Sequence, residues 1–261
     1  TAVGASALGA NTTGSENTAV GTSCLTANTT GSSNIAVGFA ALNANTTGAQ
    51  NLAIGLYAVD ANTSGSNNVG IGHAALSAST TGYSNIAVGA GGVMDACTAV
   101  GAFALSSVVV NVNNVAMGYN ALAANTTYNN TAVGAFCCDV STTAANNVAL
   151  GQSAMHAHTT GANNAALGMD ALKASTTGAQ NVAVGNLAGN TTTTGTYNIY
   201  IGYNSEASAV GVDHELVIAS ANGVGKGGST GYINPGGGLM YQGNNGTAWA
   251  QTSDRRIKKD I

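Results

Sequence analysis

The sequence predicts an all-β protein, a parallel β-solenoid (β-roll) built from 17-residue repeats. Three observations support this prediction. A short apolar motif ending in glycine recurs at an almost constant interval, the residues before that glycine alternate with period two, and a polar NTTG-type turn follows. A unit this short cannot hold a pair of helices, and its Gly, Asn and β-branched content disfavours helix.

The motif glycine occurs at thirteen positions, and ten of the twelve intervals between them are 17 residues long. The positions are Gly4, Gly21, Gly38, Gly55, Gly72, Gly89, Gly101, Gly118, Gly134, Gly151, Gly168, Gly185 and Gly202. The consensus is NxAVGxxALxANTTGxx. A repeat of this kind indicates coils that bury their apolar faces only by stacking on one another.

Residues 34–38 illustrate the expected strand. Ile35 and Val37 share one face, and Ala36 takes the other. We expect the Val/Ile face to form the core. A second short strand is expected after the glycine, with an inward apolar residue such as Leu42. In the turn that follows, Asn and Gly are expected to supply left-handed backbone conformations.

The position of Ala36 is small in each unit until Tyr200, being Ala or Gly. If it lies opposite the core, a face that stays small predicts another chain at short range, and therefore a protomer interface around a symmetry axis. The alternative is that Ala suits a tight corner of the coil. Two interruptions predict coils of different shape: five residues are missing between Gly89 and Gly101, and residues 106–114 replace the usual turn.

Composition excludes several classes of function. Only 6% of the residues are charged and the net charge is -4, which gives no reason to expect a nucleic-acid partner. No apolar run is long enough for a membrane span. The four cysteines match no zinc pattern, and Cys24, Cys137 and Cys138 stand where other repeats have Ala or Leu, so we interpret them as small core residues. We expect no cofactor.

The motif NxAVGxxAL with its glycine turn, over residues 1–202, resembles the head repeats of trimeric autotransporter adhesins. The resemblance implies a left-handed β-roll that assembles as an intertwined or side-by-side homotrimer and binds host surfaces. The repeat of those heads is shorter than 17 residues, so the resemblance implies the strands of this chain more securely than the geometry of its corners.

The stretch TAWAQTSDRRIKKDI at residues 247–261 resembles the junction before the intramolecular chaperone of phage tail fibres and tailspikes. The resemblance implies one autocatalytic cut between Ser253 and Asp254 after the trimer has folded. Ser253 would be the nucleophile and Lys258 its base, which is reasonable chemistry for a lysine whose pKa is lowered by burial. Apart from this single self-cleavage, we expect the protein to have no enzymatic activity.

Together the two resemblances predict three segments: a solenoid over 1–202, a β-rich and Gly-rich stalk or cap over 203–253, and the start of a chaperone segment over 254–261. ELVIAS, residues 215–220, is expected to be a strand. The function expected is that of a fibre, in a virion tail or another extracellular appendage, that attaches to a glycan or protein receptor on a cell surface. The alternative is the head of a bacterial trimeric autotransporter adhesin.

Several other residues are candidates for a site. His156 and His158 form an HxH pair whose rings, repeated around a trimer axis, predict a metal site, although the turn position of His158 favours the surface. Many NTT turns match the N-glycosylation acceptor, a pattern that the turn itself also explains. Exposed receptor-binding aromatics are expected at Tyr57, Tyr83, Tyr119 and Tyr128.

The sequence gives less support to two further functions. The Thr-Thr pairs suggest an ice-binding solenoid, but adjacent threonines of an extended segment point to opposite faces. A glycan-degrading tailspike needs a pair of carboxylates at a defined spacing, and the acidic residues here are scattered singly.

Overall fold

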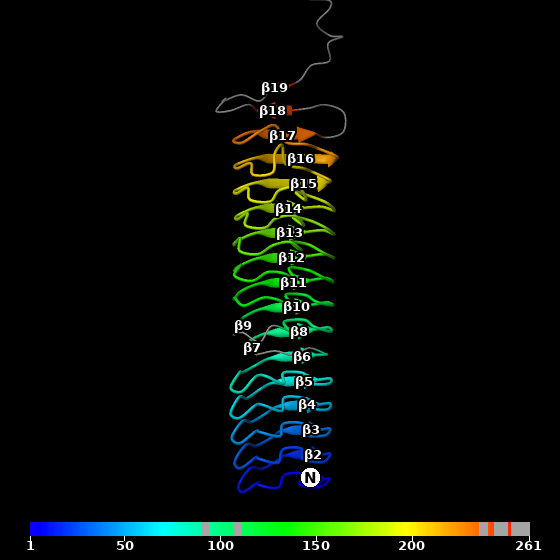
Figure 1. The fold of residues 1–261 in the computed structure, drawn as a ribbon, viewed down its shortest axis with the longest axis vertical. Coiled ribbons are helices and arrows are strands. Elements are labelled where there is room, and N and C mark those ends of the chain that lie inside the picture. The colour runs from blue at the N-terminus through cyan, green and yellow to red at the C-terminus, as the bar shows by residue number, and fades with distance from the viewer. Residues whose placement is uncertain (90–93, 107–110, 235–239, 243–249, 252–261) are drawn as a thin grey trace, which may run out of the picture. The chain divides into compact units, whose positions relative to one another are not determined.

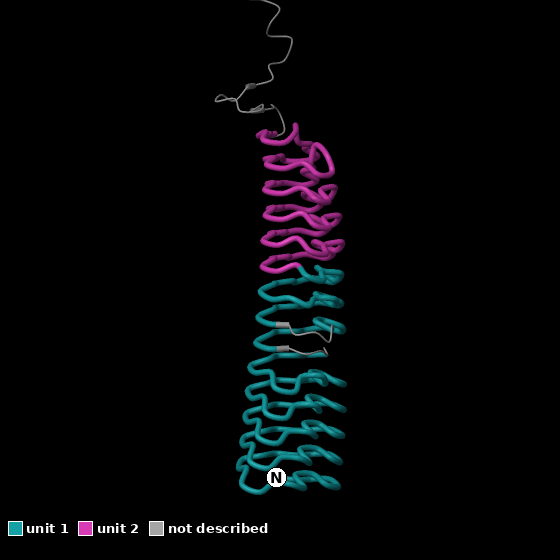
Figure 2. Tube along the Cα trace, turned by 60° about the vertical axis from the view of Figure 1, so that its left-hand side comes forward, with its two compact units in different colours: residues 1–143 teal, residues 144–261 magenta. Residues whose placement is uncertain are grey.

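The computed structural model describes residues 1–89, 94–106, 111–234, 240–242 and 250–251. The described residues contain strands and turns and no helix, which confirms the all-β solenoid with repeats of about 17 residues. The chain divides into two compact units, Thr1–Thr143 and Ala144–Ile261, coloured separately in Figure 2. Each unit is described by itself.

Unit 1 stacks one short strand per repeat into a parallel sheet (Figure 1). The strands are β1 (Ala2–Val3), β2 (Thr18–Val20), β3 (Ile35–Val37), β4 (Leu52–Ile54), β5 (Val69–Ile71), β6 (Ile86–Val88), β8 (Thr98–Val100), β10 (Val115–Met117) and β11 (Thr131–Val133). Equivalent residues pair, as Ala36 does with Ala53. The predicted strand and register are therefore confirmed.

Unit 2 repeats this arrangement with β12 (Val148–Leu150), β13 (Ala165–Leu167), β14 (Val182–Val184), β15 (Ile199–Tyr203), β16 (Leu216–Ala221) and β17 (Gly231–Asn234). Parallel pairing continues past residue 202, since Ile199 pairs with Leu216 and Leu216 with Gly231. The strand expected at ELVIAS is β16. Then β18 (Met240–Gln242) and β19 (Ala250–Gln251) pair antiparallel.

The core lies on the side of the strand opposite to the one expected. Ala36 is 0% exposed, whereas Ile35 is 44% and Val37 36% exposed. Inside the coil, Ala36 shares the core with Ala41 and Leu42, which are also fully buried. The prediction of a Val/Ile core with an outward Ala face is wrong, because the interior of so small a coil has no room for β-branched side chains opposite the leucine.

Paired changes at the two interior positions show how little room the interior has. Val59, which is β-branched, takes the leucine position, and Gly70 the alanine position beside it; a Cβ on Gly70 would lie 2.4 Å from Cγ2 of Val59. In unit 2 a large and a small residue change places. Tyr200 fills the alanine position and Gly189 the leucine position, where a Cβ would lie 2.6 Å from the Tyr200 ring.

The rest of each coil differs from expectation in two ways. In the regular 17-residue coils that the structure describes, no second strand follows the glycine; residues 39–44, for example, form turns in which Ala40 (φ 54°) and Leu42 (φ 51°) are left-handed. The NTTG turn does not supply the left-handed residues, since neither Asn45 nor Gly48 has a positive φ. Gly48 is instead required by close approach, because a Cβ there would lie 2.3 Å from the Gly65 carbonyl oxygen.

The asparagines of the repeat are interior residues that link coil to coil. The Asn45 carboxamide donates to Oδ1 of Asn28 (2.9 Å) and to the carbonyl of Gly48 (3.0 Å). The Asn34 carboxamide donates to Asn17 Oδ1 (3.2 Å) and to Gly48 O (2.8 Å). Because buried amides must be hydrogen-bonded, stacking identical residues lets the carboxamide of one coil satisfy that of the next, as it does from Asn28 to Asn62.

The two interruptions of the repeat together form a separate two-stranded parallel sheet. β7 (Met94–Asp95) pairs with β9 (Asn111–Val112), and Val112 also bridges to Tyr128. The coils there do differ in shape from their neighbours, as expected.

Candidate interaction surfaces

The outward face of the strands in unit 1 is an exposed apolar surface, here called the apolar β-face. Each repeat contributes the first and third residues of its strand, mostly Val, Ile, Leu, Met or Thr. Val20, Ile35, Val37, Ile54, Ile86, Val88 and Met117 are 36–44% exposed. Because equivalent residues pair in register, these side chains form two parallel columns along the sheet.

Unit 2 carries the same kind of face. Val148, Leu150, Leu167, Val182, Val184, Ile199 and Ile201 are 37–40% exposed, while the residue between each pair is buried. Neither face carries a charged side chain at the strand positions from Val148 to Ile218 or from Thr18 to Val133. A surface so apolar and so regular is suited to contact with another protein surface.

The four tyrosines expected on the surface are exposed: Tyr57 (40%), Tyr83 (51%), Tyr119 (47%) and Tyr128 (53%). They do not gather into one site. Tyr57 and Tyr119 follow the motif glycine, whereas Tyr83 and Tyr128 precede the buried asparagine of the next strand by two residues.

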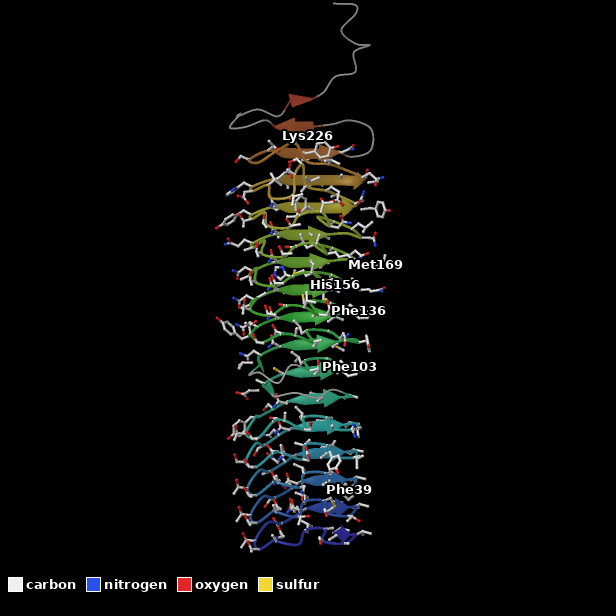
Figure 3. All side chains as sticks on the ribbon, viewed as in Figure 1. Phe39, Phe103, Phe136, His156, Met169 and Lys226 are labelled. Carbon is white, nitrogen blue, oxygen red and sulfur yellow. The ribbon has the colours of Figure 1, made fainter. Side chains whose placement is uncertain are left out.

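Tyrosine contacts instead involve phenylalanines that sequence reasoning missed. Phe39 packs edge-to-face on Tyr57, with centroids 5.5 Å apart, and Tyr119 contacts both Phe103 and Phe136. Figure 3 labels the three phenylalanines, each just beyond the end of its strand. Aligning the repeats on their glycines shows that these aromatics fall one or two residues after it, which is the signal that would have found them.

The HxH pair does not form a surface site in this chain. His158 is 0% exposed, so the expected surface position is wrong; it occupies the interior place of the turn asparagine. Its Nε2 donates to the carbonyl of Gly161 at 2.6 Å, and burial lowers the pKa of the imidazole. His156 is half-buried. The described residues hold no group of three His, Cys, Asp or Glu side chains placed to bind a metal ion.

Four of the six asparagines in the NTT-type turns are poorly suited to glycosylation. Asn28, Asn45, Asn62 and Asn125 are 0% exposed. In the first three, the side-chain nitrogen that a glycan would modify is hydrogen-bonded inside the coil. Their recurrence is explained by the ladder.

Two carboxylates are buried near the end of the parallel stack in unit 2. Glu215 follows Asn198 in its column and accepts from the backbone N–H groups of Ser208 (3.0 Å) and Gly227 (2.8 Å). Glu206 accepts from the N–H and the hydroxyl of Thr191. Backbone donors of this kind stabilise a carboxylate without a cation, so both groups are structural.

Cys24, Cys137 and Cys138 are buried, as expected for core residues, and Cys97 is buried as well; none of the four forms a disulfide within the described residues. Within the described ranges, no helix is long and apolar enough to cross a membrane. Ser253 and Lys258 lie outside the described residues. Comparison with known proteins found no matching family model, no curated relative and no solved structure.

Proposed function

We propose that this chain is the shaft of a homotrimeric extracellular fibre, of the phage tail-fibre type, that attaches to a receptor on a cell surface. The observation that supports the proposal most is the apolar β-face. Its nine strands in unit 1, about 4.8 Å apart, extend for about 40 Å. Soluble monomers seldom leave so long an apolar surface exposed.

The apolar β-face replaces the alanine column as the proposed protomer interface. Ala36 and its equivalents are inside the coil and cannot meet another chain. The outward Val, Ile and Leu columns can, and a closed ring of three chains would bury all three faces around one axis. The number three comes from the resemblance to trimeric adhesin heads and tail fibres.

Attachment is proposed to use the surfaces that face away from that axis. These carry Thr, Ser, Asn and Gln side chains together with exposed aromatic rings, a combination suited to a glycan more than to nucleic acid or lipid.

A charge placed on the apolar β-face tests the interface. Ile54 is 39% exposed in the single chain, so I54D should leave the coil folded while placing three unpaired carboxylates at the trimer axis. Size-exclusion chromatography with light scattering should give three times 25.3 kDa for the unchanged protein and the mass of one chain for I54D.

The matched control is T47D, which places the same charge on an exposed residue of the neighbouring turn and should remain trimeric. A monomeric unchanged protein at micromolar concentration, or a trimeric I54D, would contradict the proposed interface.

The second candidate is the head of a trimeric autotransporter adhesin, which the same apolar β-face would also suit. The complete gene distinguishes the two. A downstream coiled coil and membrane anchor favour the adhesin, and a chaperone domain favours the tail fibre.

Processing at Ser253 is part of the tail-fibre proposal. A precursor that extends beyond Ile261 should be cut once between Ser253 and Asp254, with Lys258 acting as the base for the Ser253 hydroxyl. The intact mass of the natural protein should then correspond to a chain ending at Ser253, and S253A should keep the full length. A natural chain that retains residues 254–261 contradicts the cut.

A further inference from the structure

Unit 1 carries a cluster of three contacting aromatic rings on its outer surface, here called the aromatic cluster: Phe103, Tyr119 and Phe136. Figure 3 labels Phe103 and Phe136. The Tyr119 ring lies 5.8 Å from Phe103 and 5.2 Å from Phe136 between centroids, at interplanar angles of 85° and 74°. Phe103 is 57% exposed and Tyr119 47%, and Phe136 is half-buried. Edge-to-face contacts hold the rings in place while leaving much of their surface open.

Polar groups lie within the same cluster. Asn120 takes the repeat position of Phe103 and Phe136 in the coil between them, next to Tyr119. Backbone bonds fix the three coils, since Asn120 N–H donates to Ala102 O (3.0 Å) and Phe136 N–H to Tyr119 O (2.9 Å). Among the residues that the structure describes, neither the Asn120 carboxamide nor the Tyr119 hydroxyl has a hydrogen-bond partner.

The cluster does not stabilise the fold by burial. Phe103 (φ 60°) and Phe136 (φ 56°) are left-handed, a conformation that is unfavourable for a bulky side chain. Most other repeats place Ser, Ala, Asn or Asp at this left-handed position, as at Ser23 and Ala40; Tyr57 and Leu187 are the other bulky side chains there. An aromatic ring that is strained and yet exposed is better explained by binding than by packing.

We propose that Phe103, Tyr119, Asn120 and Phe136 form a binding subsite for a saccharide of a surface glycan. This inference rests on the attachment function proposed above and names its site. A pyranose presents an apolar C–H face that packs on aromatic rings, and hydroxyls at its edge that bond to a carboxamide or a phenol. Phe103 and Phe136 are two coils apart, about 10 Å, which is a separation that a disaccharide can span.

The aromatic character separates this subsite from the apolar β-face. That face consists of aliphatic side chains in straight columns, which suit packing against an identical surface. The cluster instead alternates rings with free polar groups, which a protein partner would have to desolvate and a sugar hydroxyl can satisfy.

Alanine variants of the full chain test the subsite. The probe is a printed array of oligosaccharides from bacterial surface polysaccharides, followed by saturation-transfer NMR with the sugar that binds best. F103A and F136A should each weaken binding by about tenfold, the effect of losing one stacked ring. Y119F should keep the stacking and lose only the hydroxyl, so its loss should be smaller.

M169A is the matched control. Met169 is 47% exposed at the repeat position of Tyr119, but it has no ring. Binding to M169A should equal that of the unchanged chain. Circular dichroism should show all four variants folded, because each removes an exposed side chain.

The outcomes separate this inference from the proposed fibre. A trimer that binds no saccharide, or binds equally well after F103A and F136A, overturns the subsite and leaves the fibre proposal standing. If F103A loses the trimer, or a protein displaces the sugar from unaltered rings, the cluster is a protein contact and the subsite is overturned. If the unchanged protein is a monomer and F103A nevertheless weakens its binding of the saccharide, the subsite is supported and the trimer is overturned.

Discussion

The turn after the buried leucine differs between the first coils of unit 1 and the coils of unit 2. In unit 1 its interior position holds Asn28, Asn45 and Asn62 in three consecutive coils, and each carboxamide bonds to the asparagine of the coil before it and to a glycine carbonyl. Ser79 ends this column, and Ser141 takes the position in a later coil of unit 1. In unit 2 the same position holds His158, Ser175 and Thr192. The three asparagines and these three unit 2 residues are all 0% exposed.

The polar atoms of the unit 2 residues are not satisfied in the same way. His158 Nδ1, Ser175 Oγ and Thr192 Oγ1 are buried without a hydrogen-bond partner, as is the Tyr200 hydroxyl, whose pKa burial raises well above its usual range. An unpaired buried polar atom costs stability, and among Asn28, Asn45 and Asn62 only the Oδ1 of Asn62, the last of the column, lacks a partner. Unit 2 therefore replaces a largely satisfied ladder with a mixture that satisfies itself less well.

The backbone of the turn is nevertheless the same in both units. Thr46 N–H donates to Thr63 O at 2.8 Å, and Thr176 N–H donates to Thr193 O at 2.8 Å. The first threonine hydroxyl donates to that same carbonyl in both cases. The threonine and glycine backbone therefore sets the path of the turn, and the interior side chain adds stability to it. This use of the hydroxyl also explains the Thr-Thr pairs without an ice-binding face.

The largest effect that would test this comparison is expected from N45A. The variant removes the bonds to Asn28 Oδ1 and Gly48 O and leaves Asn28 Oδ1 buried without a donor. We expect a loss of about 3 kcal/mol in local stability. S175A removes a hydroxyl that has no partner, so its cost should be under about 1 kcal/mol.

Amide hydrogen exchange of the coils around residues 45 and 175 measures the free energy of local opening separately for each coil. N43A, on the exposed side of the same coil as Asn45, is the control for truncating an asparagine and should change little. Equal losses in N45A and S175A would contradict the idea that the ladder distinguishes the two units.

Strand position was predictable from sequence, and strand facing was not. Alternation over Ile35, Ala36 and Val37 says that the faces are opposite, but not which one is inside. The space inside the coil decides which face is buried, and the sequence reveals that space only where residues at the two interior positions change together, as Val59 and Gly70 do. Reading the exchange of Gly189 with Tyr200 across repeats would have placed the alanine column in the core.

For the candidate sites, too, one property could be predicted from the sequence and another could not. The exposure of Tyr119 could be predicted because it stands just outside the strand, but its contacts with Phe103 and Phe136 could not. Those contacts join residues 16 and 17 positions apart through left-handed corners, and the expected second strand had no such corners. His158 was placed on the surface because turns are usually exposed, whereas this turn folds its first side chain inward.

The smaller effect is expected from restoring the asparagine pattern in unit 2 with H158N. Because Nε2 of His158 donates to Gly161 O, Nδ1 is the unprotonated nitrogen and lacks a donor. The new carboxamide would donate to Gly161 as Asn45 does to Gly48, and its oxygen would accept from the free hydroxyl of Ser175. We expect a gain of about 1 kcal/mol at pH 7, and the gain should grow on acidification.

The sign of the pH effect follows from the pKa of His158, which burial lowers below its usual value near 6.5. Between the unfolded and the folded pKa, the unfolded chain binds the proton and the folded chain does not, so the original protein loses stability as the pH falls from about 7. H158N removes this loss, and H156N, at the half-buried histidine two residues away, is the control for replacing a histidine by asparagine. Urea unfolding of the three proteins at equal concentration between pH 7 and 4.5 measures the difference; parallel pH profiles for H158N and the original protein would show that His158 does not respond to pH inside the coil.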